Sequence, residues 1–405
     1  MGNIIVQKYG GSSVGDIDRI RNVADRVVKQ CKEGNKVVVV VSAMGKTTDE
    51  LIEKAKALSS KPSDREMDML LSTGEQISVS LLAIAVNDSC CKAISLTGSQ
   101  CGIITDFNHK KARIDMIKTD RIMKELESHD IIIVAGFQGV NRNHDITTLG
   151  RGGSDTTAVA LAAALKAEKC EIYTDVDGVY SSDPRKVKGA KKLNRISYDE
   201  MLEMAALGAG VLHPRSVELA RKYDVPLEVK SSFVYEEGTK IINRNSFEET
   251  EIRGVTLDED ISKISLLGVP DVPGIAFKIF SEISENNIPV DMIIQNVNHN
   301  GVNDISFAVK GEDYEKTMTL CQRIVKDIGA NGIIGDENVV KLSVVGTGIS
   351  GNTKITSLYF KTLYEMGINI QMISTSPIKI SCIIKNDKGI DALNKVHDIF
   401  EEYMI

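Results

Sequence analysis

Short apolar blocks and helical periodicities alternate along the first 235 residues of the chain. The apolar blocks occupy 3–9, 36–41, 93–96 and 131–139. Continuous runs of this kind are typical of strands that are buried on both faces of a parallel sheet. Hydrophobic positions at helical spacing lie between the blocks, as in 17–28. The pattern predicts an α/β domain with an open, mostly parallel sheet and helices on both faces.

The second half of the chain has a different organisation, because it repeats itself. The run 263–268 resembles 341–346, and 288–293 resembles 368–373. Each copy is expected to form a strand, a turn, an amphipathic helix and two further strands, which predicts two α+β, ferredoxin-like modules. The expected domains are 1–235, a polar linker at 236–262, a first module at 263–336 and a second at 337–405, whose last residues could pack back on the first.

Composition disfavours several classes of protein but does not indicate a particular function. Hydrophobic residues make up 42% of the chain and charged residues 26%, and the formal net charge is −7 with no basic run, which disfavours binding to nucleic acid or an anionic membrane. No apolar run reaches the roughly 20 residues of a membrane span. The seven cysteines contain no CxxC pair. They are expected to be free thiols in a reducing cytoplasm, and no zinc site or disulfide framework is expected.

The stretch 147–157 is the strongest candidate for binding a small anion. It reads Thr-Thr-Leu-Gly-Arg-Gly-Gly-Ser-Asp-Thr-Thr and leads into an alanine-rich, helix-favouring run. Gly152 and Gly153 leave space for an anion at the helix start, where Ser154 is a natural N-cap residue. Arg151 adds a guanidinium that matches a carboxylate or a phosphate, and Asp155 lies beside it.

A second phosphate-binding pattern lies at the start of the chain. The first strand ends in Lys8, and a glycine-rich turn with Gly10, Gly11 and Ser12 follows before a helix. Strand, glycine turn and helix together offer backbone N–H groups to a phosphate, and Lys8 is placed to reach its oxygens. Ser42 and Thr47 follow the next strand and are candidate hydrogen-bond donors to a ligand.

Four further regions contain candidate or structural residues. The strand 170–174 leads into a polar loop that could hold a nucleotide base and ribose, with Arg185 or nearby lysines at the phosphates. Glu75 has two open interpretations: it complements the dipole of a helix start, or it points into a cleft to hold an ammonium group. His213, before Pro214, is expected to be structural. The turn leading into a helix near Asp271 and Gly274 in the first module suits a small zwitterion.

Together these motifs resemble those of the aspartate kinases, members of the amino-acid kinase family with two C-terminal ACT domains. The resemblance covers essentially the whole chain. It rests on the following segments: 8–14 (KYGGSSV), 71–75 (LSTGE), 150–155 (GRGGSD), 174–178 (TDVDG), 211–214 (VLHP) and the two repeated modules. It implies ATP-dependent phosphorylation of the side-chain carboxylate of L-aspartate, with Mg²⁺ on the nucleotide, as the first step towards lysine, threonine and methionine.

The resemblance also assigns roles to individual residues. Lys8 would stabilise the transferring phosphoryl group, and Asp155 would orient the cationic groups. The nucleotide side would comprise Lys8, Gly10, Gly11, Ser12, Ser42, Thr174, Asp175, Tyr180, Asp183 and Arg185. The aspartate side would comprise Thr47, Glu75, Arg151, Gly152, Gly153 and Ser154. Lysine, alone or with threonine, would bind the first ACT module as a feedback inhibitor through Asp271, Gly274, Ile275, Ala276, Val290, Asp291 and Gln295.

Two departures from the family pattern affect these expectations. Gly210 stands where the family usually has a lysine at the nucleotide phosphates. Either a substitute replaces that lysine (Lys186, Lys188, Lys191 or Arg215) or the activity is lower. The second module has Asn352-Thr353-Lys354-Ile355 in place of the usual proline-glycine turn, which argues against effector binding there. The rival hypotheses are a kinase for glutamate or a nucleoside monophosphate, and a catalytically weak amino-acid sensor. A homodimer or a dimer of dimers through the ACT modules is expected.

Overall fold

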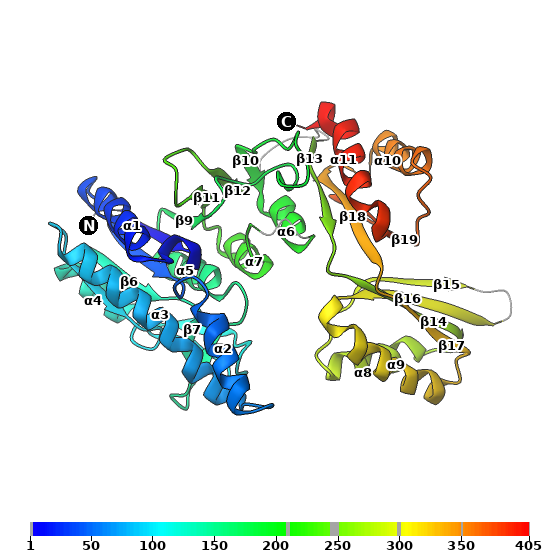
Figure 1. Ribbon diagram of the computed structural model, residues 1–405, viewed down its shortest axis with the longest axis horizontal. Helices are drawn as coiled ribbons and strands as arrows, with labels where there is room; N and C mark the ends of the chain where they lie inside the picture. Colours follow the sequence, from blue (N-terminus) through cyan, green and yellow to red (C-terminus); the bar gives the residue numbers. More distant parts are fainter. Residues whose placement is uncertain (1–2, 208–210, 244–250, 298–300, 350, 405) are drawn as a thin grey trace. The chain divides into compact units, whose positions relative to one another are not determined.

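A computed structural model describes residues 1–405 except 1–2, 208–210, 244–250, 298–300, 350 and 405. The chain divides into two compact units (Figure 1). The catalytic unit comprises Met1–Val179, Lys192–Ala206 and Gly210–Asn245, and the regulatory unit comprises Tyr180–Lys191, Leu207–Ala209 and Ser246–Ile405. Each unit is described separately below.

The catalytic unit contains an eight-stranded sheet in the order β10-β12-β11-β9-β1-β2-β6-β3. Every neighbouring pair is parallel except β11 and β12. Its strands are β1 (Ile4–Tyr9), β2 (Lys36–Val41), β3 (Ala93–Leu96), β6 (Ile131–Ala135), β9 (Lys169–Thr174), β10 (Arg195–Ser197), β11 (Leu227–Ser231) and β12 (Thr239–Ile242). The predicted mostly parallel sheet is confirmed.

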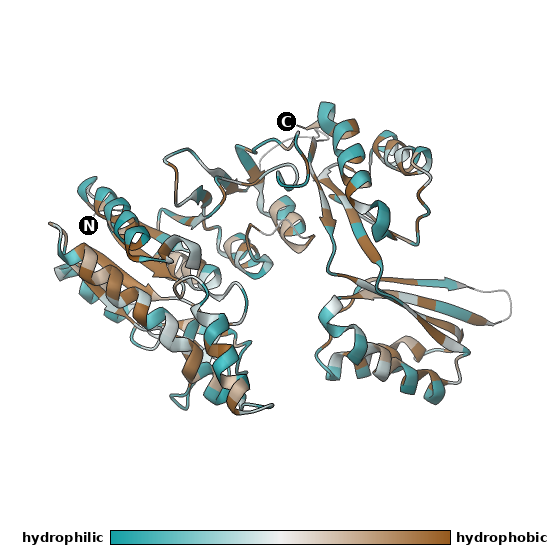
Figure 2. Cartoon of the chain, viewed as in Figure 1, coloured by the Kyte–Doolittle hydropathy of each residue, from teal (hydrophilic) through white to brown (hydrophobic). Residues whose placement is uncertain are grey.

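The helices of this unit are α1 (Ile17–Lys32), α2 (Thr47–Leu58), α3 (Asp64–Asn87), α4 (Asp120–Ser128), α5 (Gly153–Leu165), α6 (Tyr198–Ala206) and α7 (Pro214–Tyr223). Helices α1 and α3 share a hydrophobic core with alternate valines of β2, such as Val37 and Val39. The intervening valines of a strand point to the opposite face of the sheet. Helix α5 packs against β1, β2 and β9. Brown, hydrophobic residues therefore line the buried strands in Figure 2.

A small second sheet, in the order β5-β4-β7-β8, completes the catalytic unit. It contains β4 (Ile103–Thr105), β5 (Ile114–Ile117), β7 (Gln138–Val140) and β8 (Ile146–Thr148). The single strand expected at 131–139 is therefore two strands that belong to different sheets. Strand β6 ends before Gly136, and β7 begins after Phe137. Phe137 has a φ of 67°, which an extended strand does not allow.

Helix α3, with 24 residues, is the one described helix that is long and apolar enough to cross a membrane, by length and composition alone. It contacts α1, β3 and β6 inside the catalytic unit, and half of its most apolar window is buried there. It also carries the buried carboxylates of Asp68 and Glu75. These features are typical of a core helix.

The regulatory unit holds two four-stranded antiparallel sheets, in the orders β15-β16-β14-β17 and β13-β18-β20-β19. The first module contains β14 (Ser262–Pro270), α8 (Ile275–Glu285), β15 (Asp291–Val297), β16 (Val302–Val309), α9 (Tyr314–Ile328) and β17 (Gly332–Asp336). The second contains β13 (Glu251–Asp258), β18 (Val339–Thr347), α10 (Thr353–Glu365), β19 (Met372–Ser376), β20 (Lys379–Lys385) and α11 (Gly389–Phe400). The repeat in the sequence is thus a repeat of folded modules.

The two modules are interleaved in sequence. Strand β13 precedes the first module in the chain, yet it pairs with β18 of the second along Glu251–Asp258. The segment expected to be a linker, 236–262, therefore contains β13 and also β12. The second module receives its fourth strand from before the first module, whereas the first module uses β17, which follows its own second helix.

Candidate active site

The carboxyl ends of four neighbouring parallel strands, β9, β1, β2 and β6, meet at one edge of the large sheet. Each of these ends leads into a segment with candidate chemistry. Lys8 lies at the end of β1, Ser42 follows β2, and Thr174 ends β9. Open α/β sheets bind ligands at this edge, because the loops leave the strands there in diverging directions.

Lys8 is paired with Asp155 at this edge. The Lys8 Nζ atom lies 2.7 Å from Asp155 Oδ1, and both side chains are about nine-tenths buried. Asp155 belongs to the first turn of α5, so the pair joins β1 to the start of that helix. The contact is described as an ion pair and not as a hydrogen bond, because Asp155 Oδ1 has no partner in hydrogen-bond geometry.

The glycine turn after β1 approaches the loop after β2 at backbone distance. A Cβ atom on Gly11 would lie 2.7 Å from the carbonyl oxygen of Ala43, so only glycine fits there. The Gly45 N–H donates to the Gly11 carbonyl at 3.0 Å. The turn forms a short 3₁₀ helix, Gly11–Val14, and leaves Ser12 exposed. A tight glycine turn between a strand and a helix is the expected form of a phosphate-binding loop.

The predicted substrate loop is shaped by two glycines with positive φ, Gly150 at 78° and Gly152 at 67°. His213 packs against the second, because a Cβ atom on Gly152 would lie 2.2 Å from the His213 Cβ. Helix α5 begins at Gly153 with Gly152 as its N-cap, so Ser154 occupies the first turn and not the cap. The N–H of Gly153, the first residue of α5, donates to the Gly150 carbonyl of the loop at 3.0 Å. Arg151 is exposed.

His213 is structural, as expected. Its Nδ1 accepts a hydrogen bond from the Arg215 N–H at 3.3 Å and caps α7. Burial lowers the pKa of His213, and this outweighs the nearby Asp155 carboxylate, which acts to raise it.

Glu75 lies in the middle of α3, not at a helix start, so it does not complement the helix dipole. Its side chain is buried, and its Oε1 accepts a hydrogen bond from the Ala43 N–H at 3.1 Å. Its Oε2 is buried without a partner. Burial raises the pKa of Glu75 to about 7, although the hydrogen bond from Ala43 acts to lower it. A buried carboxylate with one unused oxygen is suited to accept a cationic group.

Ser42 and Thr47 border the same loop. The Ser42 N–H donates to the Tyr9 carbonyl at 3.1 Å, and the Thr47 hydroxyl donates to the Met44 carbonyl at 2.7 Å. Thr47 is the first residue of α2 and is half-buried. Its hydroxyl oxygen keeps its lone pairs for a ligand donor.

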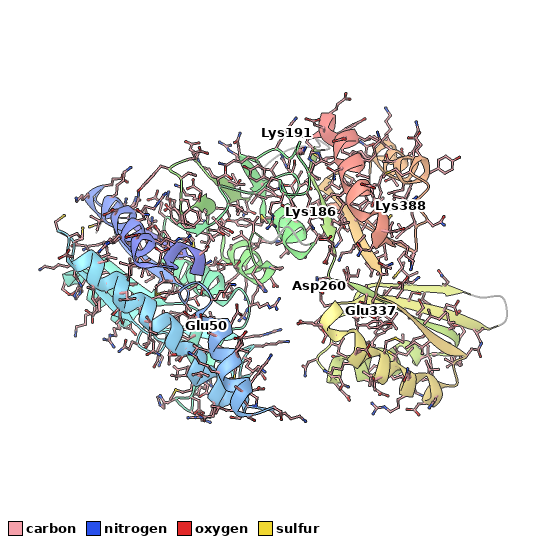
Figure 3. All side chains as sticks on the ribbon, in the orientation of Figure 1. Glu50, Lys186, Lys191, Asp260, Glu337 and Lys388 are labelled. Atoms are coloured by element: carbon pink, nitrogen blue, oxygen red, sulfur yellow. The ribbon has the colours of Figure 1, made fainter. Side chains whose placement is uncertain are left out.

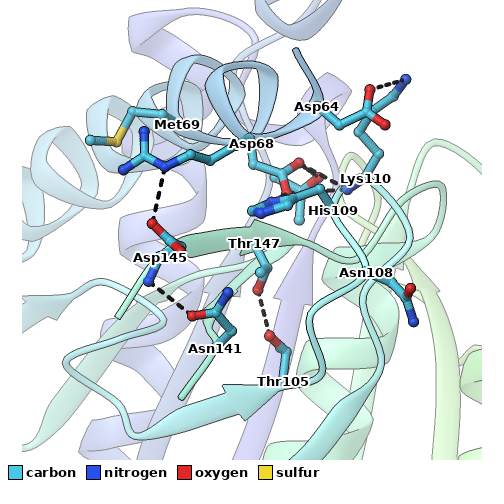
Figure 4. A network of polar contacts seen from close by, with 12 residues as sticks. Asp64, Asp68, Met69, Thr105, Asn108, His109, Lys110, Asn141, Asp145 and Thr147 are labelled. Carbon is cyan, nitrogen blue, oxygen red and sulfur yellow. Dashed lines mark hydrogen bonds and ion pairs between the residues drawn. The ribbon is translucent and has the colours of Figure 1, made fainter. Parts of the chain in front are cut away.

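A network around Asp68 supports the substrate loop and was not predicted (Figure 4). Asp68 is fully buried and accepts hydrogen bonds from the Thr148 hydroxyl at 2.5 Å and the Lys110 N–H at 3.1 Å. His109 Nδ1 lies 2.7 Å from its second oxygen. Thr148 ends β8, two residues before Gly150. The Asp68 carboxylate therefore fixes the residue that leads into the predicted substrate loop. The feature of the sequence that could have revealed Asp68 is its position on the apolar side of α3, where it shares a helical face with Glu75.

Arg215 also supports the loop. Its guanidinium donates to the carbonyls of Leu149 and Ala112, both at 2.9 Å. This residue was one of the proposed replacements for the lysine that Gly210 displaces. Gly210 itself lies outside the described residues. Because Arg215 is engaged with backbone carbonyls, its place in the structure is that of a loop support.

The predicted nucleotide residues fall into both units. Thr174 and Asp175 belong to the catalytic unit, where the Thr174 hydroxyl donates to Asp175 at 3.0 Å. The Ser13 hydroxyl bonds Ser232 at 2.8 Å, and Ser232 bonds the Thr174 carbonyl at 3.1 Å, so the glycine turn is tied to the end of β9.

Tyr180, Asp183 and Arg185 lie in the segment Tyr180–Lys191, which belongs to the regulatory unit. Arg185 contacts both oxygens of Asp183, with Nε at 3.0 Å from Oδ1 and Nη2 at 2.9 Å from Oδ2. The hydrogen bond from Arg185 is the main reason that the pKa of Asp183 is lowered. The two side chains are therefore paired with each other.

The same segment is anchored in the second ACT-like module. The Ser181 hydroxyl lies 2.9 Å from His397 Nε2, and the Val255 N–H donates to the Ser181 carbonyl at 2.8 Å. Val187 is part of that module's hydrophobic core. Lys186 pairs with Glu259, and Lys191 pairs with Glu401 at 2.9 Å; both lysines are labelled in Figure 3. Lys188 is exposed.

The predicted effector residues are divided between the two ends of the first module's sheet. Asp271 accepts a hydrogen bond from Asn303 at 3.0 Å, beside Gly274 and the start of α8, where Ile275 and Ala276 lie. Asp291 pairs in register with Ala308, five residues along β16 from Asn303 (308 − 303 = 5). That separation corresponds to about 17 Å along a strand. One copy of the chain therefore does not bring Asp271 and Asp291 together.

The remaining effector candidates follow the same division. Val290 precedes Asp291 at the start of β15, and Gln295 is exposed further along that strand. Asp291 is paired with Lys341 of the second module. Burial acts to raise the pKa of Asp291, but Lys341 outweighs it and holds that pKa below its usual value.

The start of α10 in the second module differs from that of α8. The Asn352 side chain caps α10 by accepting hydrogen bonds from the N–H groups of Lys354 and Ile355, at 3.1 and 3.4 Å. The N-cap of α8 is Gly274, which has no side chain and a φ of 90°. A side chain thus caps two N–H groups of α10, whereas no side chain caps α8, where the Ile275 N–H donates to the Val272 carbonyl at 3.3 Å.

Comparison with known proteins agrees with this architecture. The model of the amino acid kinase family matches residues 3–231, and an ACT domain model matches 264–323 and 342–400. The aspartokinase of Bacillus sp. (strain MGA3) is 50% identical over 399 residues, covering 98% of this chain and 97% of that protein. The aspartate kinase of Pseudomonas putida is 48% identical over 400 residues, covering 98% and 97%.

A solved structure supports the same conclusion. Escherichia coli aspartokinase III in complex with lysine and aspartate, in its T-state, is 25% identical with a TM-score of 0.74, and the match covers 98% of this chain and 99% of that one. The chain therefore belongs to the aspartokinases, amino acid kinases in which two ACT domains follow the catalytic domain.

Proposed function

We propose that this chain transfers the γ-phosphoryl group of ATP to the side-chain carboxylate of L-aspartate, giving 4-phospho-L-aspartate and ADP. The observation that carries the proposal is the buried Lys8–Asp155 pair at the carboxyl edge of the sheet, beside the glycine turn that follows β1. A carboxylate nucleophile is already ionised at neutral pH, so the site needs no strong base. It needs charge neutralisation and alignment, which these groups supply.

Each catalytic residue has a distinct task in this reaction. An aspartate oxygen forms a bond to the γ-phosphorus while the bond to the ADP oxygen breaks, and negative charge spreads over the phosphoryl oxygens. Lys8 lies where its ammonium group can stabilise that charge, and Asp155 holds the ammonium in place at 2.7 Å. At an effective dielectric constant of about 20, one lysine near the phosphoryl group contributes ~4 kcal/mol, or roughly three decades in rate.

The substrate is held by complementary charges. Arg151 is proposed to bind the α-carboxylate of aspartate, and the unused Oε2 of Glu75 to accept its ammonium group. Gly152, Gly153 and Ser154 would line the substrate at the start of α5, and Thr47 would contact it through its hydroxyl.

The nucleotide is proposed to lie on the glycine turn and on the end of β9. Gly10, Gly11, Ser12 and Ser42 would line its phosphates, and Thr174 and Asp175 would contact the remainder of the nucleotide. The described residues hold no cluster of three or more His, Cys, Asp or Glu side chains fit for a metal ion. Mg²⁺ is therefore proposed to arrive with ATP, held mainly by phosphate oxygens and water.

Lysine, alone or with threonine, is proposed to inhibit the enzyme through the first ACT module. The open N-terminus of α8 suits the carboxylate of an amino acid, and Asp291 suits an ammonium group. Because the two groups lie at opposite ends of one sheet, a site that uses both needs a second copy of the chain. This is consistent with the homodimer, or dimer of dimers, that we propose.

We further propose that the enzyme is cytoplasmic and performs the first step of lysine, threonine and methionine biosynthesis. The test is ATP-dependent formation of an acyl phosphate from L-aspartate, trapped as the hydroxamate with hydroxylamine. Lys8→Ala should lower turnover about 10³-fold, whereas Lys54→Ala, on the exposed side of α2, should not change it. Near-normal turnover of Lys8→Ala would refute the assignment of Lys8. Lysine binding without any product from the wild type would favour an amino-acid sensor.

A further inference from the structure

Two thiols of the catalytic unit, Cys31 and Cys91, lie in direct contact. Their Sγ atoms are 3.1 Å apart, although 60 residues separate them in the chain (91 − 31 = 60). Cys31 lies in the last turn of α1, and Cys91 lies in the connection between α3 and β3. Both are free thiols, and a covalent disulfide bond of about 2.05 Å would require them to move only ~1 Å closer.

We propose that Cys31 and Cys91 form a redox-sensitive pair, a modification site that hydrogen peroxide converts reversibly into an intramolecular disulfide. In the first step the Cys31 thiol loses its proton and the thiolate attacks one peroxide oxygen. The O–O bond breaks, and the leaving hydroxide takes up that proton, so a sulfenic acid and water result. In the second step the Cys91 sulfur attacks the sulfenic sulfur, forming the S–S bond and releasing a second water. The two thiols lose two electrons and two protons in total, and the peroxide accepts them.

The environments of the two sulfurs assign these roles. Cys31 is partly exposed and is reachable by a small oxidant. Cys91 is only 5% exposed, and burial together with the neighbouring thiols raises its pKa to about 12. A buried, protonated thiol is a poor first nucleophile. It is nevertheless in contact with the sulfur that would be oxidised first, so it is placed to resolve the sulfenic acid.

The pair is distinct from the other cysteines of the chain. Cys101, Cys170, Cys321 and Cys382 are buried, and burial raises the pKa of each well above its usual value. Cys90 is exposed and is adjacent in sequence to Cys91. Cys90→Ser is therefore a matched control, because it removes an oxidisable thiol from the same connection and leaves the contacting pair intact.

The pair lies at the edge of the sheet opposite the active site. Cys31 precedes the amino end of β2, and Cys91 precedes the amino end of β3, whereas Lys8 and the loops around it follow the carboxyl ends of parallel strands. A disulfide would join the end of α1 to the end of α3, two helices that already pack together. We therefore expect oxidation to stabilise the catalytic unit without changing turnover.

The experiment treats the full-length chain with a small excess of hydrogen peroxide and counts thiols after unfolding. The expected count falls from seven to five, with a mass loss of two hydrogens and a cross-linked peptide joining Cys31 to Cys91. Dithiothreitol should restore seven thiols. The oxidised form should unfold about 10 °C higher, as estimated for a loop of this length.

Cysteine variants show whether Cys31 and Cys91, or other cysteines, form the disulfide. Cys31→Ser, which changes a partly exposed position, should abolish the loss of two thiols, and Cys90→Ser should not affect it. Three results would overturn the proposal: seven thiols remaining after treatment, sulfinic acid at Cys31 without a cross-link, or a cross-link that joins Cys31 to Cys90 in the wild type.

Discussion

Replacing Glu75 by glutamine tests the proposed ammonium site with the smallest change of shape. The amide keeps the acceptor that receives the Ala43 N–H, which lies 3.1 Å from Oε1 in the wild type. It removes the negative charge and replaces the unused Oε2. Only the ionised carboxylate pairs with an ammonium group, so the variant separates charge from packing.

The size of the effect follows from the pKa of Glu75, which burial raises to about 7. Free enzyme at pH 6 then holds roughly one-tenth of Glu75 ionised, and at pH 8 roughly nine-tenths. The KM for aspartate should therefore fall about tenfold between pH 6 and pH 8 in the wild type. In Glu75→Gln this dependence should vanish. The KM at pH 8 should rise by roughly 10² to 10³, because an ion pair at an effective dielectric constant near 20 is lost.

The kcat of Glu75→Gln should change less than its KM, because the ammonium contact is similar in the ground state and the transition state. The assay is hydroxamate formation at varied aspartate between pH 6 and pH 8. Glu127→Gln, on the exposed side of α4, is the control for loss of one negative charge. A wild-type KM without pH dependence, or the same dependence in Glu75→Gln, would refute the reasoning.

The same pKa predicts a stability effect of known sign. The folded state binds one more proton than the unfolded state between pH 4.5, the usual pKa of glutamate, and pH 7. Stability from this group is therefore present below pH 4.5 and is lost as the pH rises through 7, by about 3 kcal/mol in total. Urea unfolding of Glu75→Gln and wild type at pH 5 and pH 8 should show the variant gaining relative stability at pH 8. An equal difference at both pH values would argue against a raised pKa.

Three further predictions concern the support of the substrate loop and the effector site. Asp68→Asn should raise the KM for aspartate about tenfold, because the amide has one acceptor oxygen where the carboxylate has two for Thr148, the Lys110 N–H and His109; Asp64→Asn, at the exposed start of α3, should not, and equal KM values for Asp68→Asn and the wild type would remove Asp68 from loop positioning. Gly152→Ala should destabilise the protein by about 1–3 kcal/mol more than Gly34→Ala in urea unfolding, because both glycines have positive φ but only Gly152 lies against another side chain; similar losses would exclude the clash. Asp291→Asn should raise the lysine concentration for half-inhibition at least tenfold with unchanged uninhibited turnover, and unaltered inhibition would rule out Asp291 as an effector ligand.

Much of the candidate site can be predicted because its residues are local to short patterns. A strand end, a glycine turn and a helix start lie within a few residues of one another, so Lys8 and Asp155 are each predicted as candidates from their own neighbourhoods. Their contact at 2.7 Å depends on β1 and α5 being brought together, which no local pattern states. Asp68 was missed for the same reason, since its partners Thr148 and His109 are 80 and 41 residues away.

By itself, the sequence determined the blocks of buried strands, the glycine turns and the duplication of the C-terminal modules. The strands and turns depend on periodicity and on the conformational freedom of single residues, and both can be read within a window of about ten residues. The duplication is read by comparing distant segments of the same chain, such as 263–268 and 341–346. Only the tertiary structure decided that β13 completes the second module, that Tyr180–Lys191 belongs to the regulatory unit, and that Asp271 and Asp291 lie at opposite ends of one sheet. Each of these depends on which strand edges pair over long separations. Pairing is decided by the packing of whole faces against one another, and a local hydrophobic pattern is compatible with several such pairings.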